Sequence, residues 1–143
     1  MVTIHRNAIV PYSAEQMYEL VNDIARYQEF VPYCVSSVVH EQSDSEIRAT
    51  LTLSAKGFQK SFTTLNHLQK NKMMSIQLID GPFKKLEGFW KFEQRDENHS
   101  EVILDLKFEL SNKIAAMMFG PVFQQVAGSL VDAFVERARC MYK

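Results

Sequence analysis

The sequence predicts one α+β domain over residues 1–143, built from an antiparallel sheet of about seven strands wrapped around a long C-terminal helix. Three observations support this prediction. Apolar and polar residues alternate from residue 35 to residue 110, which is the period of half-buried strands. Short polar breaks divide this stretch, and short connections join antiparallel strands. Residues 112–142 then carry apolar side chains at helical spacing, so this helix covers one face of the sheet.

The first strand is expected at residues 2–10, where apolar and polar side chains alternate. Its apolar face holds Val2, Ile4, Ala8 and Val10. Pro11 ends the strand, and Ser13 and Gln16 form a capping box that starts a helix. Two short helices follow, with a bend near residues 22–23. Pro32 ends the second of them because proline cannot continue a helix.

The later strands are separated by breaks rich in Gly, Asn, Asp, Ser and Pro. These breaks lie at residues 43–45, 57, 71–72, 80–82 and 96–98. The final helix carries an apolar stripe formed by Met118, Val122, Val126, Leu130, Phe134 and Ala138, flanked by Met117, Phe123, Val131 and Met141. Pro121 interrupts this helix, so we expect either a kink there or a fresh start with Pro121 in the first turn.

The composition argues against several classes of function. With 16 basic and 17 acidic side chains the net charge is −1, so no global field attracts nucleic acid or anionic lipid. Cys34 and Cys140 lie far apart without metal-ligand or redox spacing, the histidines are isolated, and no phosphate loop or serine-nucleophile motif occurs. We therefore predict no metal site and no catalytic residues. The sequence lacks a secretory signal and an apolar run of the ~20 residues that span a bilayer, which favours a cytoplasmic protein.

The strand expected at residues 58–68 mixes polar and apolar side chains on one face. That face holds Phe58, Lys60, Phe62, Thr64, Asn66 and Leu68. A β-bulge would turn the polar members outward, because a bulge resets the alternation. The alternative is an apolar cavity with a few polar groups in its wall, which is how small-molecule sites are built.

Three blocks of sequence resemble the coenzyme Q-binding family of the polyketide cyclase/dehydrase superfamily. The first runs from Tyr12 to Cys34, the second is Gly-Pro-Phe-Lys-Lys-Leu-Glu-Gly-Phe-Trp-Lys-Phe at residues 81–92, and the third is Ala-Phe-Val-Glu-Arg-Ala at residues 133–138. The order of the predicted elements also resembles the helix-grip fold of START-like lipid-binding domains. Within the family the sequence is most similar to the bacterial branch that includes the ribosome-association toxin.

The resemblance implies two functions. The first is non-enzymatic binding of ubiquinone or a similar polyprenyl lipid, in support of respiratory electron transfer, with no required cofactor. The alternative is a toxin of a toxin-antitoxin pair that binds the large ribosomal subunit and blocks subunit association. The second function requires a basic surface. Its candidate residues are Arg6, Arg48, Lys70, Lys72, Lys84, Lys85 and Lys91.

A ligand cavity is expected between the sheet and the last helix. Its predicted ligand-binding residues are Phe30, Phe62, Thr64, Asn66, Leu86, Trp90, Phe119, Phe123, Val126, Leu130 and Phe134. The entrance is expected where the turn at residues 81–83 meets residues 114–123, with Phe83 projecting outward and Lys84 and Lys85 beside it. Such a mouth would allow a transient membrane contact, with the lysines close to lipid phosphates. Nothing in the sequence indicates the oligomeric state.

Overall fold

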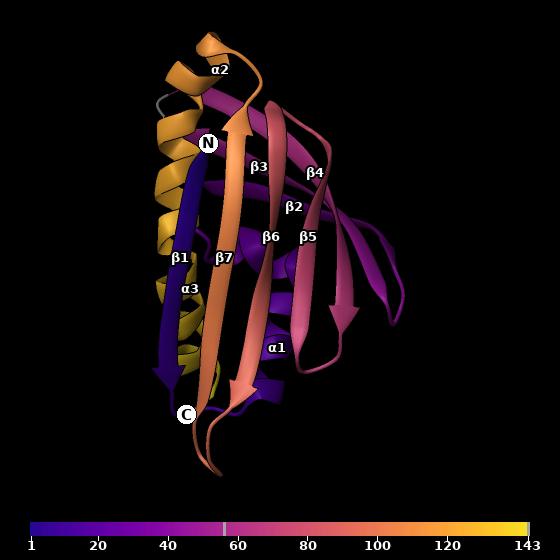
Figure 1. Cartoon of the computed structure of the whole chain (residues 1–143), viewed down its shortest axis with the longest axis vertical. Coiled ribbons are helices and arrows are strands. Elements are labelled where there is room, and N and C mark those ends of the chain that lie inside the picture. The colour runs from indigo at the N-terminus through magenta and orange to yellow at the C-terminus, as the bar shows by residue number, and fades with distance from the viewer. Residues whose placement is uncertain (56, 143) are drawn as a thin grey trace.

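The computed structural model describes residues 1–55 and 57–142. Its strands are β1 (Val2–Val10), β2 (Cys34–Gln42), β3 (Glu46–Ala55), β4 (Phe58–Gln69), β5 (Met73–Asp80), β6 (Phe83–Gln94) and β7 (Ser100–Leu110). Its helices are α1 (Ala14–Asn22), the 3-10 helix η1 (Ile24–Glu29), α2 (Lys113–Met118) and α3 (Gly120–Met141). Figure 1 shows these elements in their places.

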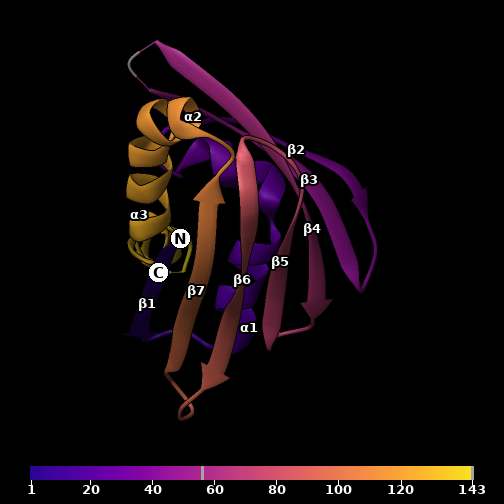
Figure 2. The ribbon, with the colours of Figure 1, turned by 45° about the horizontal axis from the view of Figure 1, so that its top comes forward.

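The strands form one seven-stranded sheet in the order β1-β7-β6-β5-β4-β3-β2. Each neighbouring pair is antiparallel. Figure 2 shows β2, β3 and β4 turned away from β1 and β7, so the sheet bends around the helices. In both views α3 runs beside β1, and α1 lies behind the central strands. The predicted α+β helix-grip architecture is confirmed.

The breaks in the alternating pattern mark the turns. The turns at residues 43–45, 70–72, 81–82 and 95–99 separate the strands close to the predicted positions. Asn71 has φ 64° and Gly57 has φ 76°, left-handed conformations that glycine and asparagine adopt most readily. The choice of residue at these turns is therefore a consequence of backbone geometry.

The start of α1 has the predicted capping box. The Gln16 N–H donates to Ser13 Oγ at 3.0 Å, and the Ser13 N–H donates to Gln16 Oε1 at 2.9 Å. These bonds satisfy two backbone donors that a helix start otherwise leaves unpaired. Asp23 then separates α1 from η1, as the expected bend near residues 22–23 requires.

The last helix consists of two pieces. Pro121 lies in the first turn of α3, so the fresh start is the alternative that the structure adopts. The predicted stripe is correct for α3 as far as Ala138. It is wrong for Met141 at the end of α3 and for Met117 and Met118 of α2, all three of which are exposed. In Figure 1, α2 lies past the end of β7, so the sheet does not cover it. The residues of α3 that are buried are Phe123, Val126, Ala127, Val131, Phe134 and Ala138.

The strand β4 keeps its alternation. Its register with β3 is continuous from Phe58 to His67, so no bulge turns Thr64 or Asn66 outward. The register shift beside Thr63 and Thr64 occurs in the pairing with β5 and leaves both Thr64 and Asn66 buried. The bulge alternative is therefore wrong for these two residues. Lys60 on the same strand is exposed.

Candidate functional site: an apolar cavity

A cavity of about 80 Å³ lies between the curved sheet, η1 and α3. Its wall is formed by Ile24, Tyr27, Val31, Ala49, Leu51, Leu53, Phe62, Thr64, Asn66, Met74, Ile76, Leu86, Trp90, Leu106, Phe123, Val126, Ala127 and Leu130. Most of these side chains are apolar, because the inward face of each strand carries the apolar half of its alternation.

The volume sets a limit on what the cavity holds as it stands. A water molecule needs about 10–15 Å³ of such space, whereas sites for drug-sized ligands have about 300–1,000 Å³. At about 80 Å³ the cavity has room for a small apolar group and not for a long polyprenyl chain. Binding of a larger lipid therefore requires its walls to move apart.

Most of the predicted ligand-binding residues lie in the cavity wall. These are Phe62, Thr64, Asn66, Leu86, Trp90, Phe123, Val126 and Leu130. Phe30, Phe119 and Phe134 are not among the wall residues, and each packs its ring against other aromatic rings. Phe134 contacts Trp90 and Phe30 with ring centroids 5.2 and 5.1 Å apart, and Phe119 contacts Phe83 at 5.7 Å.

The sequence prediction missed several wall residues. Ala49, Leu51, Leu53, Met74 and Ile76 line the cavity from β3 and β5, and the period-two pattern already places them on the inward face. Ile24, Tyr27 and Val31 line it from η1 and the segment after it. Their spacing of three and four residues is that of one helical face, so the sequence held a signal for these three residues that the prediction did not use.

The predicted outward projection of Phe83 is wrong. Phe83 is 6% exposed and packs against Phe62, Phe119 and Phe123, with centroids 5.6, 5.7 and 4.8 Å apart. Gly81, at φ 150°, explains this position. A Cβ on Gly81 would lie 2.6 Å from Phe62 Cβ, so only glycine lets the turn lie against β4 and direct Phe83 inward.

A separate groove of about 510 Å³ lies outside this aromatic cluster, between the turn at residues 81–82 and α2. Phe58, Lys60, Pro82, Ile114 and Met118 are among its lining residues, and none of its lining residues also lines the cavity. Phe62 and Phe123 of the cavity wall contact Phe83, which in turn contacts Phe119 beside α2.

One buried polar atom of the wall has no partner among the described residues. Asn66 Oδ1 is buried without a hydrogen bond, and Asn66 is 5% exposed. Thr64, two residues earlier on the same face of β4, is 9% exposed. The third polar wall residue, Tyr27, donates its hydroxyl to the Val21 carbonyl. Burial raises the pKa of Tyr27 well above its usual range, so the phenol remains protonated.

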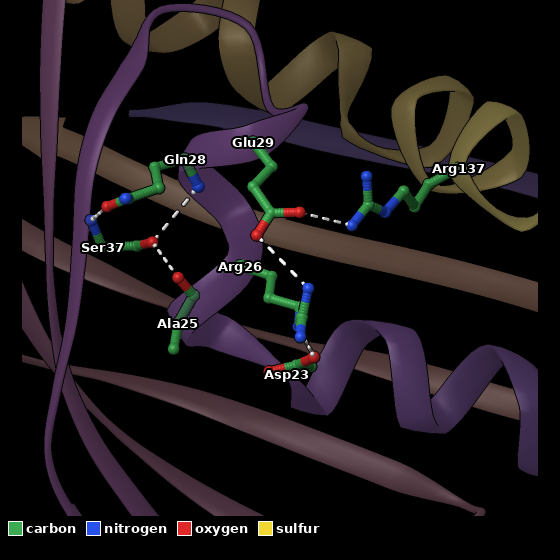
Figure 3. A network of polar contacts seen from close by, with 7 residues as sticks. All are labelled: Asp23, Ala25, Arg26, Gln28, Glu29, Ser37 and Arg137. Atoms are coloured by element: carbon green, nitrogen blue, oxygen red, sulfur yellow. Dashed lines mark hydrogen bonds and ion pairs between the residues drawn. The ribbon is translucent and has the colours of Figure 1, made fainter. Parts of the chain in front are cut away.

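The helix η1 contributes to the cavity wall. Figure 3 shows the polar contacts that join it to its neighbours. The Ser37 hydroxyl donates to the Ala25 carbonyl at 3.0 Å, and the Ser37 N–H donates to Gln28 Oε1 at 3.0 Å. On the other side, Arg137 of α3 donates to Glu29 at 2.7 Å, and its guanidinium lies 4.8 Å from the centre of the Phe30 ring. The helix η1 is therefore joined to both β2 and α3.

Within the part of the chain that the structure describes, no group of three or more His, Cys, Asp or Glu side chains has the spacing to hold a metal ion. No helix of the described residues is long and apolar enough to cross a membrane. Cys34 is buried, and this burial raises the pKa of its thiol. The neutral thiol is a poor nucleophile.

Comparisons with known proteins agree with this architecture. Residues 10–135 match the family model described as polyketide cyclase / dehydrase and lipid transport. The ribosome association toxin RatA of Vibrio cholerae is 44% identical over 142 residues, which are 99% of each chain. The mitochondrial coenzyme Q-binding protein coq10 of Schizosaccharomyces pombe is 26% identical over 142 residues, which are 94% of this chain and 85% of that one.

Among solved structures, the crystal structure of TTHA0849 from Thermus thermophilus has the same fold. Its TM-score is 0.84 at 19% sequence identity, and the match covers 99% of this chain and 100% of that one. The family match over residues 10–135 and the 44% identity to a full-length relative both exceed what a shared fold alone provides. The chain therefore belongs to the polyketide cyclase / dehydrase and lipid transport family.

Proposed function

We propose that this protein binds the large ribosomal subunit and blocks its association with the small subunit. The observation that carries the proposal is the 44% identity to the ribosome association toxin of Vibrio cholerae over 99% of both chains. The coenzyme Q-binding relative is 26% identical. We therefore rank ribosome binding above quinone binding, the reverse of the order expected from the sequence. Under this proposal the protein acts in the cytoplasm, where it binds ribosomes. The proposal also includes an antitoxin as a partner of this protein.

The exposed lysines differ in their availability for ribosomal RNA. Lys84 lies 3.5 Å from Glu109 and Lys85 lies 3.1 Å from Glu87, so neighbouring carboxylates offset both charges. Lys70 and Lys72 lie in the turn between β4 and β5, are exposed, and form no ion pair with a described residue. Lysines of this second kind are the better candidates for contacts with phosphates.

Neutralising this turn tests the proposal. We predict that the double change Lys70→Gln and Lys72→Gln weakens co-sedimentation with purified large subunits by about ten-fold at low salt, because two phosphate contacts are lost. The double change Lys84→Gln and Lys85→Gln is the matched control, since it removes the same net charge from paired positions. An equal loss in both double variants would show that general charge, and not this turn, carries the binding.

We also propose that the cavity holds an uncharged lipid, of which a polyprenyl quinone is one example. The wall is apolar apart from Tyr27, Thr64, Asn66 and the indole N–H of Trp90. Each buried CH₂ group contributes about 0.8 kcal/mol, so even part of a lipid tail binds firmly. The similarity to a coenzyme Q-binding protein supports the quinone as the first ligand to test.

The lipid is proposed to enter from a membrane during a transient contact. Ile114 and Met117 are each 74% exposed and Met118 is 49% exposed, so α2 presents an apolar surface beside the groove described above. Contiguous apolar side chains of this kind mark membrane or partner contacts. Entry of the lipid then requires the ring cluster around Phe83, or another part of the wall, to shift.

We propose binding without chemical conversion. General acid-base catalysis works best with groups whose pKa lies near the working pH. In the described wall, Tyr27 has a pKa far above that range, and the side chains of Thr64 and Asn66 do not titrate near neutral pH. The wall therefore suits a reversible binding site.

A further inference from the structure

The carboxamide oxygen of Asn66 is a polar atom held in an apolar cavity wall without a partner. The side chain is 5% exposed, and its Oδ1 atom is buried with no hydrogen bond to a described residue. Most buried polar atoms in folded proteins are hydrogen-bonded, because leaving one unpaired is costly. An unpaired group of this kind in a cavity wall indicates that something other than the protein completes its hydrogen bonds.

The neighbours of Asn66 explain why the protein supplies no partner. Across the sheet Asn66 pairs with Ile47 on β3 and with Ile76 on β5, and both side chains are apolar. Two residues earlier, Thr64 pairs with Ala49 and Leu78, which are apolar as well. Asn66 and Thr64 therefore form a small polar patch on β4 within an apolar surface. A molecule in the cavity is the remaining source of hydrogen bonds.

The same wall restricts the charge of that molecule. No described residue of the wall carries a charged side chain, so a carboxylate or phosphate placed there would be buried without a counter-charge. A carboxamide both donates and accepts hydrogen bonds, which suits a hydroxyl or a carbonyl oxygen. A purely hydrocarbon ligand would leave the amide unpaired.

We infer that the cavity selects uncharged lipids whose head carries a hydroxyl or carbonyl oxygen, and that Asn66, assisted by Thr64, sets this selectivity. The inference rests on the proposed lipid binding and specifies the class of lipid. Alcohols, phenols and quinones belong to the class, whereas ionised fatty acids and plain hydrocarbons do not.

Three small probes with the same six-membered ring separate these possibilities: cyclohexanol, cyclohexane and cyclohexanecarboxylate at neutral pH. Trp90 is the single tryptophan of the sequence and lines the cavity, so its fluorescence reports occupancy. For the wild-type protein we expect cyclohexanol to bind at least about ten-fold more tightly than the carboxylate, because the anion has no counter-charge there. Comparable affinities for these two probes would overturn the inference.

The role of Asn66 is tested with Asn66→Leu, which replaces the amide by an apolar side chain of similar size. We expect the ratio of cyclohexanol affinity to cyclohexane affinity to fall about ten-fold, because one hydrogen bond to a buried group is lost. A merely structural role would change stability and leave this ratio as it is. Gln77→Leu is the matched control, since Gln77 is exposed on β5 and does not line the cavity, and its ratio should equal that of the wild type.

Thr64→Val provides a second measurement on the same patch. It should lower the ratio as well, by a smaller factor than Asn66→Leu. An unchanged ratio in both variants, with cyclohexane still bound, would overturn the inference and leave lipid binding standing. Failure of the wild-type protein to bind any of the three probes would instead contradict the proposed lipid binding itself.

Discussion

Replacing Phe134 by alanine is expected to lower the free energy of unfolding by about 3–5 kcal/mol, the usual cost of deleting a buried aromatic ring. Phe134 is 0% exposed. Its ring lies 5.2 Å from Tyr27, 5.1 Å from Phe30 and 5.2 Å from Trp90, measured between centroids. The ring thus joins α3 to η1 and β6 behind the cavity, and its loss removes the packing that holds these elements together.

Urea denaturation followed by circular dichroism measures this effect. The control is Val135→Ala, one position along α3, where the side chain is half-buried and the loss should be smaller. If Phe134→Ala cost less than about 1 kcal/mol, the ring contacts behind the cavity would contribute little, and the packing described for η1 would be wrong.

Leu130→Lys is expected to abolish lipid binding. Leu130 lines the cavity from α3, and no described wall residue carries an acidic side chain to pair with an ammonium group. An unpaired charge in an apolar environment is strongly unfavourable, so an ammonium group in this part of the wall excludes an apolar ligand. We expect a stability loss of about 1–3 kcal/mol together with the loss of any lipid that co-purifies with the wild-type protein.

Mass spectrometry of lipids extracted from protein purified without detergent is the measurement for this variant. Leu130→Met is the matched control, because it keeps the volume and apolar character of the side chain and should retain the lipid. A folded Leu130→Lys protein that retains the lipid of the wild type would show that this part of α3 does not contact the ligand. A wild-type protein that yields no lipid would argue against lipid binding as a whole.

Most of the fold could be predicted from the sequence because its signals are local. The alternation from residue 35 to residue 110 fixes which side chains face inward, and the polar breaks fix the turns. Ser13 and Gln16 determine where α1 starts, and Pro121 determines where α3 starts. Each of these features depends on residues that are close in sequence.

The site was harder to predict because it depends on distances between elements. Periodicity assigned Phe62, Trp90 and Val126 to the inward side, but it could not show that Phe134, also inward, lies behind other rings and not at the cavity surface. Phe83 was misplaced for a similar reason. A turn with Gly81 and Pro82 suggests that the following side chain is exposed. The close approach of Gly81 to Phe62 instead places Phe83 inside the protein.

The exposed methionines of α2 show the same limit. Met117 and Met118 continue the helical spacing of α3, but the chain turns at residues 119–120, and α2 extends past the end of the sheet. Spacing identifies an apolar face and does not show whether another element covers it. The volume of a cavity likewise depends on how neighbouring side chains fill space, which no pattern along the chain encodes.

The association of purified ribosomal subunits tests the proposed function most directly. Small and large subunits are mixed at a magnesium concentration that joins them, with and without this protein, and separated on a sucrose gradient. We predict that the wild-type protein lowers the joined fraction in proportion to its concentration and sediments with the large subunit, and that Lys70→Gln with Lys72→Gln reduces both effects. An unchanged joined fraction, with the protein remaining at the top of the gradient, would contradict the proposal.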